Sequence, residues 1–525
     1  RAAVTFEAYR RIVHDIADIA ADQLEVIGIA KDLPRYGIKS VRLANVPASM
    51  PNSFDYPTPA PTLPQQYFWR DRGRTMPAPV NIVFLFADQL RWDFVGCYGA
   101  GFARTPHLDR LAAEGVLYER AISQHPVCIP ARAALLTGCN ALSTGVLTNN
   151  QWLRPDHDAC GMPGWPGLLG TAGWHTAAIG KMHFIPWDAA EGFTERRIAE
   201  DKRHVHIQDD YAAYLATKGL RKLRGWEQPG YVEHRMAAVS PIGVADQVDV
   251  WVGREAVRFL DAYRGDAPYA LMVSFPGPHD PYDPPADRAA RFDPAAMPAP
   301  RADTPESGRF REAIVEQHAG GSSRVDLATY PEHDRRLARA HYCALVEMID
   351  EQVGAILEAI ERRGDGGRTL VVFASDHGDF LGDYGFLGKS LLFEPAMHVP
   401  LIVRAPSVTP GTRSAALVTV TDLFATFLSA AGLANGTGAD SFVLPGLGLE
   451  AGNGRRHALG AVGEGTCIDD GRFRLARYTN GLRTLYDLAA DPDERVNLAD
   501  AEHGREVLAR LDELLAAETL RAVLR

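Results

Sequence analysis

Four apolar runs that each end in polar side chains constrain the fold more than any other feature of this sequence. The runs are VNIVFLFA from residue 80, WHTAAIG from residue 174, YALMVSF from residue 269 and TLVVFAS from residue 369. A continuous apolar run is typical of a strand that is buried on both faces, as in a parallel sheet covered by helices. Ligands of open α/β sheets bind at the carboxyl ends of the strands. We therefore predict an α/β fold in which the polar residues after these runs share one crevice.

Two of the runs end in pairs of residues that are suited to a cation. Asp88 and Gln89 come directly after the first run, and Asp376 and His377 come after the last. Two carboxylates, an amide oxygen and an imidazole can together hold one divalent cation. Seen alone, such pairs at strand ends are more often turn residues or helix caps.

The segment Cys128-Ile129-Pro130-Ala131-Arg132 precedes a sequence that reads as the first turns of a helix. A cysteine at a helix N-terminus lies at the positive end of the helix dipole, where an anion is favoured. Arg132 is four residues further on, so it shares a helical face with Cys128 and can reach it or a bound anion. Without other information, a small buried thiol before a helix would be the ordinary interpretation.

CIPAR followed by AALLTG resembles the C-x-P-x-R signature of the sulfatase family, within the alkaline-phosphatase-like superfamily. The resemblance continues in order through NIVFLFADQLRWD, GKMH at 180–183, SDHGD at 375–379, LGKS at 387–390 and LYDLAADPDERVNLA at 485–499. It runs from about residue 80 to the C-terminus. It implies a large mixed, mostly parallel sheet sandwiched by helices, with a smaller C-terminal α+β subdomain.

The resemblance also implies a metal site and a modified nucleophile. The expected metal ligands are Asp88, Gln89, Cys128, Asp376 and His377. The pairs Asp-Gln and Asp-His resemble the choline-sulfatase and phosphonate-monoester-hydrolase branch, so we expect Ca²⁺, with Mn²⁺ as the alternative. Cys128 is expected to be oxidised to formylglycine (3-oxoalanine), whose hydrate attacks the substrate. Arg132 is expected to hold the nucleophile and the metal ligands in place.

The same resemblance implies further roles. Lys181 and Lys389 are expected to bind the substrate and neutralise its non-bridging oxygens, and Asn149 to face the substrate. His279 is expected to protonate the departing alcohol together with Lys389. His183 is expected to take a proton so that the ester formed on the nucleophile collapses and releases sulfate.

These residues predict a sulfuric ester hydrolase that converts a sulfate ester into an alcohol and sulfate. The alternative enzyme is a phosphonate monoester or phosphodiester hydrolase with the same nucleophile. The GKMH segment favours the sulfatase, because the phosphonate hydrolases place Tyr- and Thr-type residues where Lys181 and His183 stand. A solute-binding module is a weaker, non-enzymatic alternative that rests on residues 1–70.

Composition narrows the partners and the compartment. A formal net charge of −11 argues against a nucleic-acid-binding surface. The six cysteines contain no C-x-x-C pair, which fits separate reduced thiols. No apolar stretch long enough to cross a bilayer and no secretory signal is visible, so we expect a cytoplasmic protein without a membrane partner. The expected partners are a small sulfated substrate and, during maturation, a formylglycine-generating enzyme; a homo-oligomer is compatible with the sequence.

Residues 1–75 differ in character from the rest of the chain. Their segment RLANVPASMPNSFDYPTPAPTLPQQYFW is rich in Pro and Asn and resembles the C-terminal tail of periplasmic oligopeptide-binding proteins. We expect an N-terminal extension that arose by gene fusion or from a reading frame that begins upstream of Met76. The alternative is a genuine arm that packs on the enzyme. The catalytic domain is expected at 76–444 and the C-terminal subdomain at 445–525.

Overall fold

The structure of the protein is a computed structural model in which the chain divides into two compact units, Arg1–Pro77 and Ala78–Arg525. The described residues are 80–320, 323–434, 440–449 and 454–524, together with four two-residue strands before residue 80. These short strands form two antiparallel pairs, β1 (Val26–Ile27) with β2 (Ile38–Lys39) and β3 (Leu43–Ala44) with β4 (Phe68–Trp69). Everything else expected for residues 1–75 lies outside the described residues.

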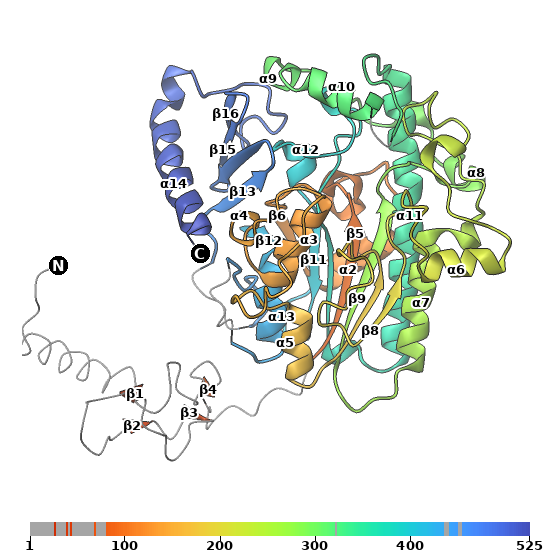
Figure 1. Cartoon of the computed structure of the whole chain (residues 1–525), viewed down its shortest axis with the longest axis vertical. Helices are drawn as coiled ribbons and strands as arrows, with labels where there is room; N and C mark the ends of the chain where they lie inside the picture. Colours follow the sequence, from red (N-terminus) through yellow and green to blue (C-terminus); the bar gives the residue numbers. More distant parts are fainter. Residues whose placement is uncertain are drawn as a thin grey trace, which may run out of the picture. The chain divides into compact units, whose positions relative to one another are not determined.

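An eight-stranded sheet forms the centre of the second unit (Figure 1). Across the sheet the strands are β12 (Thr412–Thr419), β6 (Val116–Ile122), β11 (Leu401–Arg404), β10 (Thr369–Ser375), β5 (Asn81–Asp88), β9 (Tyr269–Pro278), β7 (His175–Gly180) and β8 (Glu195–Ile198). Only β11 runs antiparallel to its neighbours. Each of the four apolar runs lies in a strand, which confirms the predicted mixed, mostly parallel sheet.

Helices cover both faces of this sheet, and the alternation along β5 explains why. Val83, Leu85 and Ala87 join one hydrophobic core, whereas residues 82, 84 and 86 join the other. Since successive side chains of a strand point to opposite faces, an all-apolar strand needs a cover on both sides. One core is shared with α2 (Pro106–Glu114), α7 (Val248–Ala262) and α11 (Glu332–Arg362), and the other with α3 (Cys128–Thr137), α5 (Trp165–Thr171) and α13 (Asp422–Ala430).

Shorter helices lie in the connections. They are α4 (Ala141–Thr144), α6 (Asp210–Thr217), α8 (Ala286–Ala289), α9 (Pro305–Gly308), α10 (Arg311–Gly320) and α12 (Glu394–Met397). Three of them, α8 to α10, fall in the long insertion after β9. Among the residues that the structure describes, no helix combines the length and the apolar character that a membrane span requires. The cytoplasmic location stays a prediction.

A four-stranded antiparallel sheet and a final helix form the C-terminal part, as predicted. Its elements are β13 (Ala458–Val462), β14 (Gly465–Asp469), β15 (Phe473–Tyr478), β16 (Arg483–Asp487) and α14 (Arg505–Val523). One face of the sheet, with Leu475 and Leu485, packs against α14, whereas Ala476 and Tyr486 on the other face join the core of the catalytic part. The C-terminal sheet is therefore buried on both faces. Its boundary at residue 445 stays a prediction.

Parallel pairing fixes the position of the site. Strands β10, β5, β9 and β7 are neighbours and run in the same direction. Their carboxyl ends therefore meet at one edge of the sheet, which is where the polar residues of the sequence motifs begin.

Candidate active site

Cys128 is the first residue of α3, as the sequence predicts, and comes after Val127 in extended conformation. The Asn149 side-chain oxygen accepts a hydrogen bond from the Ile129 backbone N–H at 2.9 Å. Asn149 thus satisfies one of the free N–H groups at the start of the helix. This contact places Asn149 close to Cys128, and its contact with substrate stays a prediction.

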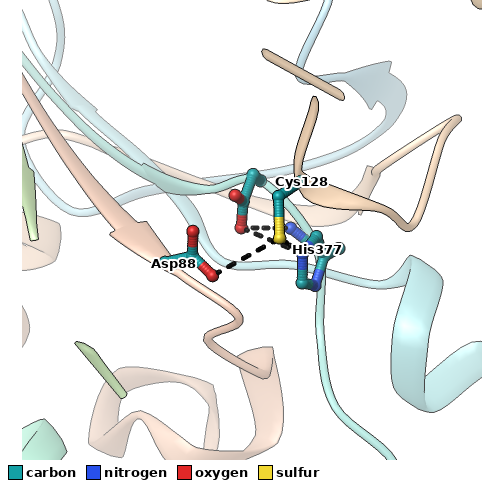
Figure 2. Close-up of side chains that lie close together, drawn as sticks. Asp88, Cys128 and His377 are labelled. Atoms are coloured by element: carbon teal, nitrogen blue, oxygen red, sulfur yellow. Dashed lines mark hydrogen bonds and ion pairs between the residues drawn. The ribbon is translucent and has the colours of Figure 1, made fainter. Parts of the chain in front are cut away.

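Four buried side chains, Asp88, Cys128, Asp376 and His377, bring possible ligand atoms within 4.8 Å of one another. The Cys128 sulfur lies 3.2 Å from His377 Nε2 and 3.9 Å from Asp88 Oδ1, between the two side chains in Figure 2. His377 Nδ1 is 2.9 Å from the Gly378 carbonyl oxygen. Nδ1–H is the donor in that contact, so in the neutral ring the Nε2 lone pair lies on the sulfur side, an arrangement typical of a metal ligand.

The electrostatics of this cluster fit a cation. Asp88 and Asp376 are both completely buried. Burial and the neighbouring Asp88 carboxylate raise the pKa of Asp376. Two buried carboxylates disfavour each other's charge unless positive charge lies between or beside them. The donor set of carboxylate oxygens and an imidazole nitrogen therefore suits a divalent cation.

Gln89 occupies a strained position beside this cluster. Its φ of 68° is in the left-handed region, which costs energy for a residue with a side chain. Its backbone N–H donates to Asp376 Oδ1 at 2.9 Å, and its side-chain NH₂ donates to Asp379 Oδ2 at 2.5 Å. Its side-chain oxygen accepts from Lys389 Nζ at 2.5 Å. The contacts hold the amide oxygen at the site, and its role as a metal ligand stays a prediction.

Arg132 joins the two carboxylates. Its Nη2 lies 2.9 Å from Asp88 Oδ2 and its Nε 3.0 Å from Asp376 Oδ2. A third contact, from Nη1 to the Lys181 carbonyl oxygen at 2.7 Å, ties α3 to the end of β7. The planar guanidinium suits this task because its donors point in fixed directions.

Two lysines bring positive charge to Cys128. Lys181 is fully buried, and its Nζ lies 2.7 Å from Asp88 Oδ2. Lys389 Nζ lies 2.5 Å from His279 Nε2. Burial alone would raise the pKa of the Cys128 thiol, but Lys389 and Lys181, followed by His377, hold it well below its usual value. The site therefore stabilises negative charge at this position.

The two histidines are held differently. His279 is buried, with Nδ1 2.9 Å from the Asp280 carbonyl oxygen and Nε2 facing Lys389. His183 has a φ of 59°, and its backbone N–H donates to the Glu200 carboxylate at 3.1 Å. Within the described part of the chain, His183 Nδ1 has no hydrogen-bond partner. One imidazole is thus paired to a lysine, and the other keeps a nitrogen available.

Several residues around these groups, all buried except the half-buried Arg203, were not predicted as site residues from the sequence. They are Glu200, Asp201, Arg203, Asp280, Asp379 and Tyr282. Asp280 and Asp379 lie next to or inside the sequence motifs, so their proximity to His279 and Asp376 was a usable signal. Residues 200–203 gave no such signal, because the preceding strand β8 reads Glu-Arg-Arg-Ile and is not apolar.

Known structures share this fold. The phosphonate monoester hydrolase of Agrobacterium radiobacter aligns with a TM-score of 0.73 at 23% identity, covering 84% of this chain and 96% of that one. The phosphonate monoester hydrolase SpPMH from Silicibacter pomeroyi aligns with a TM-score of 0.70 at 22% identity, covering 84% and 96%. At these sequence identities the similarity shows a shared fold and no more.

Curated proteins that are similar in sequence to this chain are named as sulfatases. An arylsulfatase of Clostridium perfringens is 26% identical over 83% of this chain and 94% of its own length. A choline-sulfatase of Rhizobium meliloti is 27% identical over 81% of this chain and 83% of its own length. The family described as Sulfatase matches residues 80–433, which include every candidate site residue above. The chain belongs to the sulfatase family, and it is a sulfuric ester hydrolase.

Proposed function

We propose that this enzyme cleaves a small sulfate ester into an alcohol and sulfate, with the residue formed from Cys128 as the nucleophile. The observation that carries the proposal is the position of Cys128 at the start of α3, buried between Asp88, His377 and two lysines. Burial raises the pKa values of Cys97 and Cys467 to about 12, because neither thiol has the lysines that outweigh burial at Cys128. The nucleophile is proposed to be formylglycine, made from Cys128 by a formylglycine-generating enzyme.

A divalent cation is proposed to be held by Asp88, Gln89, Asp376 and His377, next to the residue formed from Cys128. When bound, it would make a hydroxyl at residue 128 more acidic and would offset the charge of the sulfate oxygens. The oxygen-rich set fits Ca²⁺, and the His377 nitrogen keeps Mn²⁺ as the alternative. Asp376→Ala should lose the cation, measured by elemental analysis of the purified variant, because it removes a buried carboxylate ligand.

The remaining groups are proposed to act on the substrate. Lys181 and Lys389 both lie near Cys128 and would bind the non-bridging oxygens, where negative charge must be balanced. The Lys389–His279 pair, at 2.5 Å, would deliver a proton to the oxygen of the departing alcohol. His183, with its unpartnered Nδ1, would take a proton from residue 128 and so permit release of sulfate.

A phosphonate monoester or phosphodiester hydrolase is the second candidate. The ligand pairs Asp-Gln and Asp-His fit both enzymes, because they resemble a branch that contains choline-sulfatases and phosphonate monoester hydrolases, whereas Lys181 and His183 favour the sulfatase. An assay of 4-nitrophenyl sulfate against 4-nitrophenyl phenylphosphonate tests the choice. We expect kcat/KM to be at least about tenfold higher for the sulfate, a difference of about 1.4 kcal/mol in transition-state stabilisation. A preference for the phosphonate ester would reverse the assignment.

A further inference from the structure

The segment after edge strand β8 contacts the catalytic groups from outside the proposed site. Strand β8 pairs with β7 in parallel, with Ile198 opposite Gly180. The residues that come after the two strands therefore run side by side. Residues 181–183 supply the proposed lysine and histidine, and residues 200–203 face them.

Glu200 supports the backbone of this neighbouring segment. It is 1% exposed, and its Oε1 accepts the N–H groups of Met182 and His183, both at 3.1 Å. Its Oε2 also lies 3.1 Å from the His183 nitrogen. Because His183 is in the left-handed region, these contacts stabilise a conformation that the residue would not adopt readily by itself.

Asp201 supports the Lys181 side chain. It is 1% exposed, and its Oδ2 lies 3.0 Å from Lys181 Nζ. A lysine ammonium is a point charge on a flexible stem, and once buried it needs counter-charge. Asp88 supplies one carboxylate at 2.7 Å and Asp201 supplies another. The ammonium is thereby held between two carboxylates instead of resting on Asp88 alone.

Arg203 extends the contact to the leaving-group side. Its Nε and Nη2 donate to the Asp201 carboxylate at 3.0 and 2.8 Å. Its Nη1 lies 3.2 Å from Asp280 Oδ2, and its Nη2 lies 3.1 Å from His279 Nε2. One guanidinium thus joins the carboxylate beside Lys181 to the carboxylate and imidazole at the end of β9.

We propose that Asp201 and Arg203 are positioning residues that hold Lys181 and His279 in one charged unit, while Glu200 holds the backbone beside them; the three residues are here named the 200–203 clamp. The inference rests on the proposed function for the roles of Lys181 and His279. Asp201 acts through Lys181, and Arg203 acts through His279. The two arms of the clamp therefore predict different kinetic effects.

The Asp201 arm is tested by Asp201→Asn, which keeps the shape of the side chain and removes its charge. We expect kcat/KM to fall about 10- to 100-fold, by the same factor for an aryl sulfate and an alkyl sulfate, because Lys181 contacts oxygens common to both. In a Lys181→Met background the same substitution should change kcat/KM less than about threefold, since residues that act as a unit are not additive. Equal losses in both backgrounds would show that Asp201 does not act through Lys181 and would overturn this arm.

The Arg203 arm is tested by Arg203→Gln. The Arg203 side chain is 30% exposed, so the fold should tolerate its loss even if Asp201→Asn fails to fold. We expect an alkyl sulfate to lose about tenfold more kcat/KM than 4-nitrophenyl sulfate, because only the alkyl group needs a proton to depart. A loss independent of the leaving group would overturn the link to His279.

Asp210→Asn is the matched control. Asp210 also supports β8, by accepting the Ile198 N–H at 2.7 Å, and its ion pair is with Arg197 at the surface. Its kcat/KM should stay within about twofold of the unmutated enzyme. Failure of the proposed function would appear in the unmutated enzyme as a preference for the phosphonate ester. The clamp is tested by the ratio of kcat/KM between each variant and the unmutated enzyme, on whichever ester the enzyme turns over. Failure of the clamp and failure of the proposed function are therefore distinguishable.

Discussion

Two buried networks of charged side chains in this molecule are built from similar residues and do different things. The arginine network joins the C-terminal sheet to the catalytic part through Arg120, Glu394, Asp469, Arg474 and Glu494. Each of its six carboxylate oxygens accepts a hydrogen bond from a protein donor. The network is closed on its acceptor side, because each of these oxygens is matched by a donor inside the protein; on the donor side, Arg120 Nε has no hydrogen-bond partner among the described residues.

The network around Cys128, which is the proposed catalytic site, is open at one point. Asp88 Oδ2 faces Arg132 and Lys181, but among the described residues Asp88 Oδ1 has the Cys128 sulfur and His279 Nε2 as its neighbours, both at 3.9 Å. His377 Nε2 points at the same sulfur. The thiol is a weak donor at this distance, and a buried carboxylate oxygen with so weak a partner is costly unless something else binds it. The open network is therefore suited to receive a ligand, whereas the closed one needs none.

The largest difference should appear between the two buried cysteines of these regions. Cys128→Ala should abolish turnover, by about 10⁴-fold or more, because it removes the proposed nucleophile. Mass spectrometry of the peptide that contains residue 128 should show loss of sulfur and gain of an aldehyde in the unmutated enzyme. An active preparation in which Cys128 remains a thiol would contradict the proposal.

Cys467→Ala is the control for that experiment. Cys467 lies on β14, is fully buried, and packs in the same hydrophobic core as the catalytic part. Its loss should cost on the order of 1 kcal/mol of stability through lost packing. Turnover at 25 °C should stay within about twofold, since the closed network around Cys467 lies outside the proposed site.

The next largest effect should fall on stability and spare the chemistry. Arg474→Met leaves Glu394 and Asp469 buried with Arg120 as their arginine partner, which should destabilise the protein by about 3–5 kcal/mol. Arg472→Met is the matched control, because Arg472 is 63% exposed and pairs with Asp487 at the surface. Thermal unfolding measures both variants. The folded Arg474→Met protein should keep its metal content and kcat, and a lost metal would show that the two networks are not independent.

A smaller and more selective effect should separate two buried histidines. His279→Gln should reduce kcat/KM for an alkyl sulfate by about 10²–10⁴-fold and for 4-nitrophenyl sulfate much less, because nitrophenolate leaves without a proton. His398 is also buried, where it contacts Glu394 in the arginine network at 2.8 Å and stacks on Trp92. His398→Gln should show no dependence on the leaving group. Steady-state kcat/KM values over a series of sulfate esters show how each variant depends on the pKa of the leaving alcohol. An equal dependence in the two variants would contradict the role of His279.

The fold could be predicted from the sequence because its strands are locally unambiguous. The run from Val80 to Ala87 is apolar at every position but Asn81, so only a strand covered on both faces can bury it. Edge strand β8 could not be predicted, since Glu195 to Ile198 has neither an apolar run nor an alternation. Its place is set by pairing with β7, a contact that no local pattern encodes.

The residues of the candidate site also divide into those that could be predicted from the sequence and those that could not. Residues that come after apolar strands or lie in the CIPAR motif could be placed together from the sequence, and Asp88, Cys128, Asp376 and His377 do lie together in the structure. Asp201 and Arg203 could not, because their partners come after β7 and β9 and their own segment looks like an exposed charged loop. The left-handed backbone of Gln89 was equally hidden, since it is imposed by contacts with residues almost 300 positions away.

The smallest effect concerns how the closed network responds to pH. Burial, offset in part by Arg474, raises the pKa of Glu494 from its ordinary 4.5 to about 7. The folded protein therefore holds this proton more tightly than the unfolded chain. The resulting stabilisation is complete below pH 4.5 and is lost as the pH rises through about 7.

Glu494→Gln removes this titration, so between about pH 5 and about pH 8 the variant should lose less stability than the unmutated protein, by on the order of 1 kcal/mol. The amide can itself be less stable at a fixed pH, because its NH₂ must face either Arg474 Nη1 or the Glu394 backbone N–H, both of which are donors. The slope with pH, measured as the change in Tm, is therefore the informative quantity. Identical slopes in the two proteins would mean that Glu494 stays ionised throughout this range, paired with Arg474. In that case the arginine network would carry three buried carboxylates against two arginines, and its closure would rest on hydrogen bonds instead of matched charge.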